Sequence, residues 1–235
     1  HDWGYNFLFS TGQSNNFSYK VTLARNSTDQ QVFPRQGSDF TFSVQLTPPY
    51  SLFRDPNTNY QSMTDQEKST DRYRWIEYHK WTFKGALYTK IVGDLVLMAR
   101  AQFGYLGSYN KKWGYSPFEG YQVGGDGMSG YNTYGSEIIA LRGYENYSLT
   151  PRDENGVYSG HIYDKFTIEL RYPLVLQPSS TIFALLFLEG GNCWDRIEKF
   201  NPFEIKRSAG VGLRVMLPLM TLRVALAMPS SSYIL

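Results

Sequence analysis

Two short stretches of the sequence contain residues that can form a buried ion pair. The first is Leu141-Arg142-Gly143-Tyr144, and the second runs from Phe187 through Glu189 to Gly191. An arginine fork on a carboxylate fixes geometry as well as charge. A buried cation needs such a partner, because it otherwise loses its hydration without compensation. Arg142 could therefore be held by Glu189, with Phe187 stacked on the guanidinium. The alternative is that Arg142 is an exposed loop residue and Glu189 lies at a strand end, and the spacing alone favours that alternative.

Residue types that carry catalysis or bind metals are not arranged for either role. The histidines His1, His79 and His161 are scattered and lack the spacing of metal ligands. Cys193 is the only cysteine, so no intrachain disulfide can form. No serine, cysteine or carboxylate pair suggests a catalytic set. We expect a protein that is not an enzyme and that uses neither a metal nor a cofactor.

Alternation of polar and apolar residues predicts the strands that position the ion pair. In the run 180–189, Phe187 and Glu189 are two positions apart and so share one face. In the run 164–173, Glu169 lies on the polar face, and the opposite face is apolar. Both carboxylates are therefore expected on the polar, inner side of a sheet whose apolar side suits lipid.

We expect about nine strands, joined alternately by short and long connections. They are 2–10, 16–25, 39–47, 73–91, 94–106, 164–173, 180–189, 205–217 and 221–228. Short turns at one end and long loops at the other are typical of outer-membrane barrels. The connection 107–163 is longer than structureless loops usually are. It is rich in Tyr, Trp and Gly, and we expect it to fold into the barrel lumen with Arg142 holding it there.

Composition is compatible with a membrane barrel and disfavours a nucleic-acid-binding module. The chain has 235 residues, of which 17% are aromatic, a bias that favours strands. Its mean hydropathy of −0.40 does not exclude a membrane protein, because half of each barrel strand faces a polar lumen. With 23 basic and 21 acidic residues, the net charge is only +2. We therefore expect no nucleic-acid partner.

Five segments of the chain resemble the barrel domain of BamA-type outer-membrane assembly proteins. The motif of that family's sixth extracellular loop, [VIL]-R-G-[FY], is matched at 141–144, and its strand motif F-x-[DE]-x-G is matched at 187–191. Three more stretches are similar, at 33–38, 46–51 and 203–214. The segments occur in the family's order, and the resemblance runs from about residue 16 to about residue 219. The family usually has Asp where this chain has Glu189.

The resemblance implies two groups of site residues. The loop-anchoring motif comprises Arg142, Gly143 and Tyr144. The lumen partners are Glu169, Phe187, Glu189 and Gly191. Removal of Arg142 is expected to leave the inward carboxylates unpaired, to loosen the loop and to lower activity. Arg100, Arg171 and Arg214 also fall on inward faces and are expected to line a solvated lumen.

The resemblance also implies a function. The family folds and inserts β-barrel proteins into the outer membrane of the bacterial cell. Expected partners are unfolded outer-membrane protein clients, the lipoproteins of the assembly complex and outer-membrane lipid. In that family a sixteen-stranded barrel follows periplasmic POTRA repeats, and clients pair with the edge strand at its seam.

We interpret residues 1–235 as an incomplete, all-β, antiparallel transmembrane barrel portion. Its strands correspond to the seventh to fifteenth of the family, without the seam strands, and the tail at about 220–235 diverges. We expect that the chain alone does not close a barrel, because an open sheet edge leaves unpaired backbone groups in lipid.

Two alternatives stay open. A two-partner-type secretion pore of the same superfamily shares the loop motif but exports one substrate through its lumen. A soluble secreted β-sandwich that binds a ligand would instead bury the apolar face of 39–46 in a core. Sandwich strands are usually shorter, at about 5–6 residues.

Overall fold

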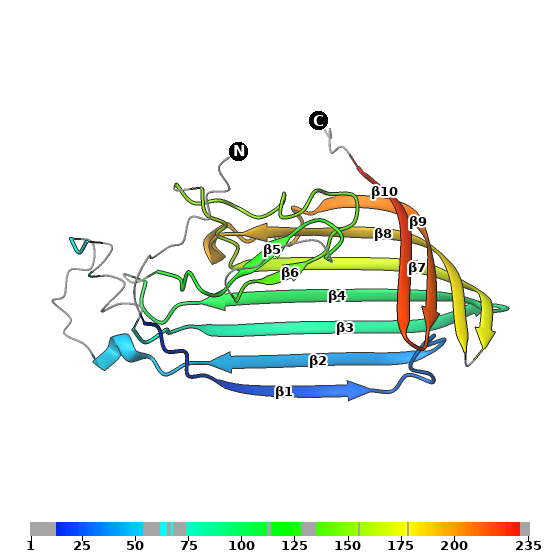
Figure 1. Ribbon diagram of the computed structural model, residues 1–235, viewed down its shortest axis with the longest axis horizontal. Coiled ribbons are helices and arrows are strands. Elements are labelled where there is room, and N and C mark those ends of the chain that lie inside the picture. Colours follow the sequence, from blue (N-terminus) through cyan, green and yellow to red (C-terminus); the bar gives the residue numbers. More distant parts are fainter. Residues whose placement is uncertain are drawn as a thin grey trace.

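The computed structural model describes residues 13–53, 62–64, 67, 74–111, 114–127, 135–154, 156–177 and 179–230. Eight strands form one antiparallel sheet in the order β1-β2-β3-β4-β7-β8-β9-β10 (Figure 1). Their bounds are β1 Tyr19–Asn26, β2 Gly37–Leu46, β3 His79–Val92, β4 Leu95–Gly107, β7 Ile162–Gln177, β8 Ser180–Trp194, β9 Lys206–Leu217 and β10 Met220–Pro229. Each strand pairs with its neighbour in the chain, except that β7 follows β4 across a long loop.

The predicted strands match the observed ones with shifts at their ends. The strand expected at 73–91 begins at His79, and those expected at 164–173 and 180–189 continue to Gln177 and Trp194. The strand expected at 2–10 lies outside the described residues. Residues 220–229, in the divergent tail, form β10 in regular register with β9. The structure therefore has longer central strands than the alternation alone indicated.

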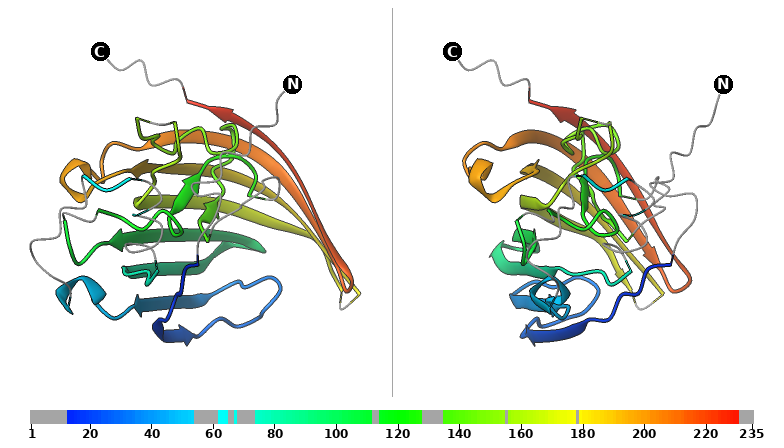
Figure 2. Two further views of the ribbon diagram at one scale, coloured as in Figure 1. Left: turned by 60° about the vertical axis from the view of Figure 1, so that its left-hand side comes forward. Right: turned by 90° about the vertical axis from the view of Figure 1, so that its left-hand side faces the viewer.

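The sheet is curved but open. Its edge strands are β1 and β10, and within the described residues neither pairs with a further strand (Figure 2). This agrees with a portion of a barrel. Within the described parts of the long connections at one end lie two 3-10 helices, η1 (Tyr50–Phe53) and η3 (Ile197–Lys199). No helix among the described residues is long and apolar enough to cross a membrane.

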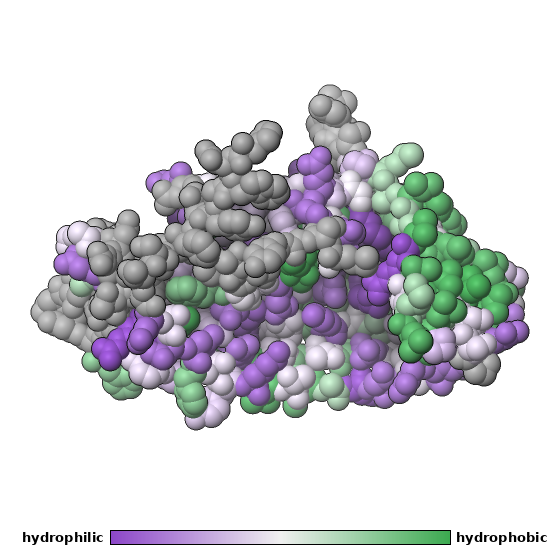
Figure 3. All heavy atoms as spheres, viewed as in Figure 1, coloured by the Kyte–Doolittle hydropathy of each residue, from purple (hydrophilic) through white to green (hydrophobic). Residues whose placement is uncertain are grey.

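The two faces of the sheet differ as the alternation predicts. Along β8, Phe187 and Glu189 are buried on the concave side, whereas Leu186 and Leu188 are 55% and 58% exposed on the convex side. Figure 3 shows apolar side chains gathered over the outside of β9 and β10. Exposed apolar side chains on other strands include Val21, Leu23, Trp81, Leu87, Phe166 and Ile168, and those on β9 include Val211 and Leu213. The convex side therefore suits contact with lipid.

The β-sandwich alternative requires this apolar face to be covered, and it is not. Phe42 and Leu46 would lie in a sandwich core, but they are 38% and 41% exposed. No second sheet of the described residues packs on that side. The prediction of a β-sandwich is therefore wrong, because the apolar face of this sheet is not packed against a second sheet of the described residues.

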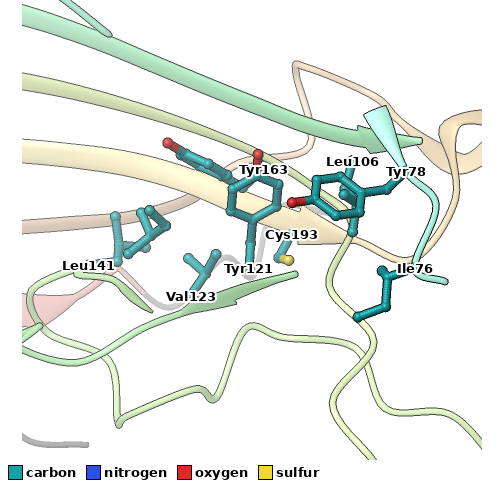
Figure 4. Packing of buried hydrophobic residues seen from close by; sticks show 9 residues of the cluster. Ile76, Tyr78, Leu106, Tyr121, Val123, Leu141, Tyr163 and Cys193 are labelled. Atoms are coloured by element: carbon teal, nitrogen blue, oxygen red, sulfur yellow. The ribbon is translucent and has the colours of Figure 1, made fainter. Parts of the chain in front are cut away.

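The connection between β4 and β7 lies against the concave face of the sheet (Figure 2). It contains two short parallel strands, β5 (Tyr121–Val123) and β6 (Glu137–Ile139). Apolar side chains of this loop pack with those of the wall, as Figure 4 shows. The loop contributes Tyr121, Val123, Ile139 and Leu141, and the wall side contributes Ile76, Tyr78, Leu106, Tyr163 and Cys193. This packing supplies a core that one curved sheet could not form alone.

A shorter connection also reaches the concave side. Phe33, between β1 and β2, is 1% exposed and meets the ring of Phe183 at a centroid distance of 5.1 Å. Val96, Leu185 and Phe187 complete this second apolar cluster. This cluster adjoins the charged residues described next, because the Phe187 ring also contacts Arg142.

Candidate functional site

Arg142 lies where the loop leaves β6 and meets the inner faces of β7 and β8. Its Nη2 atom donates hydrogen bonds to Glu169 Oε1 at 2.7 Å and to Glu189 Oε1 at 2.8 Å. The backbone N–H of Arg142 donates to Glu189 Oε2 at 3.0 Å. Glu189 therefore binds the loop through both main chain and side chain. The two carboxylate side chains are only 1% and 3% exposed.

Phe187 forms the surface on which the arginine rests. The guanidinium carbon of Arg142 lies 3.6 Å from the centroid of the Phe187 ring. Gly210, on the neighbouring strand β9, pairs with Phe187, and a Cβ at this position would overlap that ring. The glycine therefore leaves the space that the ring needs. The Phe187 ring on one face and the two carboxylates at Nη2 together restrict the guanidinium.

Four further residues complete the site, which we call the Arg142 cluster: Arg142, Glu169, Glu189, Lys165, Thr167, Arg171 and Arg214. Lys165 Nζ lies 3.1 Å from Glu189 Oε1, and Thr167 Oγ1 donates to the same oxygen at 3.2 Å. Arg171 contacts Glu169 Oε2 at 2.7 Å, and Arg214 contacts Glu169 Oε1 at 3.0 Å. Each carboxylate is thus shared by several cations.

Two expectations need correction. Arg171 does not line a solvated lumen, since it is 4% exposed and ion-paired with Glu169. Arg214 contacts Glu169 but also lines a cavity beside the cluster together with Arg100, as expected for these two residues. Removal of Arg142 also does not leave the carboxylates unpaired, because Glu169 keeps two arginines and Glu189 keeps Lys165. The structure therefore gives Arg142 the role of attaching the loop, while the other cations neutralise the wall.

The remaining motif residues shape the contact between loop and wall. Gly143 has a positive φ of 91°, and a Cβ there would lie 3.1 Å from the Ser208 side chain. A side chain at Gly143 would therefore be strained and crowded. The Tyr144 hydroxyl donates to the carbonyl of Arg207 at 2.8 Å. At Gly191 a Cβ would lie 2.5 Å from the carbonyl oxygen of Asp164, so this residue permits close pairing of β7 and β8.

The electrostatics of the cluster favour a permanently charged arginine. Burial by itself lowers the pKa of the Arg142 guanidinium, but hydrogen bonds and charge from Glu189 and Glu169 outweigh that effect and raise the pKa above its ordinary value. A cavity of about 600 Å³ adjoins the cluster and is lined by Lys84, Arg100, Gln102 and Arg223 among others. The arrangement can fix a loop.

The fold and the cluster together define a class of protein: a portion of a transmembrane β-barrel whose inner wall holds a long loop, with Arg142 as one point of attachment. The model of the Omp85 superfamily domain matches residues 5–234. The chain belongs to the Omp85 superfamily, a family of outer-membrane proteins.

Comparison with solved structures agrees with this assignment at the level of fold. The chain is similar to the crystal structure of BamA from Haemophilus ducreyi lacking POTRA domains 1–3, with a TM-score of 0.62 and 18% sequence identity. The similarity covers 92% of this chain and 39% of that one. The chain therefore spans about two fifths of the length of the structure it matches. No curated protein matches the sequence.

Proposed function

We propose that the natural protein folds β-barrel proteins and inserts them into the bacterial outer membrane. The observation that carries the proposal is the Arg142 cluster, in which a long loop is fixed to the inner wall at the motif of BamA-type proteins. Three other segments of the chain resemble that family in the same order. A loop so attached keeps the lumen occupied and gives the barrel wall a defined shape.

The proposed partners follow from the two faces of the sheet. The convex face presents apolar side chains such as Leu188 and Val211, and outer-membrane lipid is its proposed partner. Unfolded outer-membrane proteins are the proposed clients, and the lipoproteins of an assembly complex are proposed to act with the barrel. Client strands would pair with the edge strand at the barrel seam, which we expect to lie outside residues 1–235, since unpaired backbone N–H and C=O groups offer a template for strand addition.

The test is a folding assay with the natural protein in lipid vesicles. A denatured outer-membrane barrel protein is diluted into the vesicles, and its conversion to a compact band that shifts on boiling is followed on gels. We expect the conversion to be faster than in vesicles without the protein. If client folding is not accelerated and a secreted substrate crosses the vesicle membrane instead, the proposal is wrong and the secretion-pore alternative takes its place.

A further inference from the structure

A second group of buried charges lies where the loop meets strand β3. Lys80 is on the concave face and is 5% exposed. Its Nζ atom lies 3.1 Å from Glu119 Oε2 and 2.9 Å from Glu137 Oε1, and both carboxylates belong to the loop. We call Lys80, Glu119, Glu137 and Tyr78 the Lys80 cluster.

The fold of the loop itself brings the two carboxylates together. β5 and β6 pair in parallel, with Tyr121 opposite Glu137. The backbone N–H of Glu137 donates to the carbonyl of Gly120 at 2.9 Å, which places Glu137 beside the residue that follows Glu119. The Tyr78 hydroxyl, from the wall, donates to Glu119 Oε1 at 3.3 Å. The β5–β6 pairing therefore holds these two carboxylates close to the same lysine, although their charges repel each other.

The burial of Lys80 makes the loop carboxylates necessary. A buried ammonium group loses much of its hydration, and this cost is offset only when fixed anions replace the water. Lys80 Nζ also lies 5.2 Å from the centroid of the Tyr121 ring, which adds a weaker attraction. The wall thus contributes one cation here, and the loop contributes two anions.

β6 connects this group to the Arg142 cluster. Arg142 follows Glu137 by five positions, and an extended chain of that length spans at most about 18 Å. Between them, Ile139 and Leu141 are 7% and 0% exposed and pack in the apolar cluster of Figure 4. A short segment held by charges at both ends and by apolar contacts between them has little freedom to slide.

We propose that Lys80 is a positioning residue that sets the place of β6 and thereby presents Arg142 to Glu169 and Glu189. The loop is then attached to the wall at two points. At one point the loop supplies the cation, and at the other it supplies the anions. This inference deepens the proposed function, on which its relevance to client assembly rests. The structural part of the inference does not depend on what the barrel assembles.

The experiment measures amide hydrogen exchange in the natural protein, held in lipid vesicles, for peptides that cover β6 and residues 141–144. In Lys80→Met we expect exchange of both segments to rise about tenfold, because opening of the loop becomes easier. Lys80→Arg, which keeps the charge, should stay within about threefold of the unchanged protein. The double variant Lys80→Glu with Glu137→Lys should recover part of the protection, because a cation–anion contact is restored.

Lys90→Met is the matched control. Lys90 lies on the same face of β3, is exposed, and makes no ion pair with the described residues. Its replacement should leave exchange of β6 unchanged. If Lys80→Met fails to give a heat-modifiable barrel, Glu137→Gln replaces it, since this side chain is 38% exposed in the loop. Glu137→Gln should raise exchange in the same two segments by a smaller factor.

Unchanged exchange of β6 in Lys80→Met and in Glu137→Gln would overturn the inference. So would a rise in β6 that does not extend to residues 141–144. The measurement does not use assembly activity, so such a result would leave the proposed function standing. Conversely, failure of the client-folding assay would leave the exchange result standing.

Discussion

The Arg142 cluster and the Lys80 cluster attach the same loop to the same wall with opposite charges. At the first, the loop supplies a cation and the wall supplies Glu169 and Glu189. At the second, the wall supplies Lys80 and the loop supplies Glu119 and Glu137. Because the signs are reversed, Arg142 cannot take the site of the two loop carboxylates beside Lys80 without bringing like charges together. The loop carboxylates likewise cannot take the site of Arg142 beside the wall carboxylates. The difference therefore fixes the direction in which the loop lies.

The two clusters also differ in what remains when one residue is lost. Around Glu169, three arginines share one carboxylate, and that carboxylate is the common partner on which they depend. Around Lys80, the dependence is reversed, since two carboxylates share one lysine. The most sensitive positions are therefore on the wall in both cases. This comparison can be tested by substitutions of graded effect.

The largest effect is expected for Glu169→Gln. The guanidinium groups of Arg142, Arg171 and Arg214 would lose their shared anion while still close to one another. Breaking a buried ion pair by removing one partner typically costs about 3–5 kcal/mol of unfolding free energy. Urea unfolding of the natural protein in lipid vesicles measures this change.

Glu198→Gln provides the control for Glu169→Gln. The Glu198 side chain is 63% exposed and its contact with Lys111 is 3.8 Å long. Exposed pairs of this kind contribute little to stability. An equal loss of stability in both variants would contradict the dependence of the three arginines on Glu169.

Gly210→Ala should have the next largest effect and should act on the Arg142 cluster and on the pairing of β9 with β10, but not on the Lys80 cluster. The added Cβ would overlap the Phe187 ring and the carbonyl oxygen of Leu226. Overpacking of this kind costs about 1–3 kcal/mol. Amide exchange should rise at residues 141–144 and stay unchanged around Lys80. Ala209→Val, on the exposed side of the same strand, is the control and should change neither region.

Phe187→Leu should have the smallest effect of the three, and it isolates the stacking of Arg142. The guanidinium carbon of Arg142 lies 3.6 Å from the centroid of the Phe187 ring. Loss of this stacking is expected to lower the free energy of unfolding by about 1 kcal/mol, in addition to the loss caused by the smaller side chain. Phe183→Leu is a matched control in the same strand. Arg171 and Arg214 lie 5.7 Å and 5.8 Å from the Phe183 ring, so stacking contributes less there. Loop exchange that rises equally in both variants would show that packing, and not stacking, holds the loop.

The sequence predicted the faces of the strands well, because alternation determines which side chains share a face. It placed Phe187, Glu189 and Glu169 on the inner side together. It did not predict which inner neighbours touch, because that depends on register between strands. Arg214 reaches Glu169 only because β9 pairs with β8 in the observed register.

The Lys80 cluster left no comparable signal in the sequence. Glu119 and Glu137 lie in a loop without regular alternation, and their approach depends on the parallel pairing of β5 with β6. Lys80 appears as one more polar residue at the start of an alternating run. One signal was available in principle: both carboxylates border short stretches of apolar and aromatic residues, Tyr121–Val123 and Glu137–Ile139, that proved to be strands.

The most direct test of the whole account is client folding by the Arg142→Ala variant of the natural protein in lipid vesicles. Because Arg171, Arg214 and Lys165 still neutralise the wall carboxylates, the account predicts a barrel that remains folded and heat-modifiable. It also predicts that exchange rises at residues 141–144 and that client folding slows by about tenfold or more. A folded Arg142→Ala barrel that assembles clients at the rate of the unchanged protein would contradict the account.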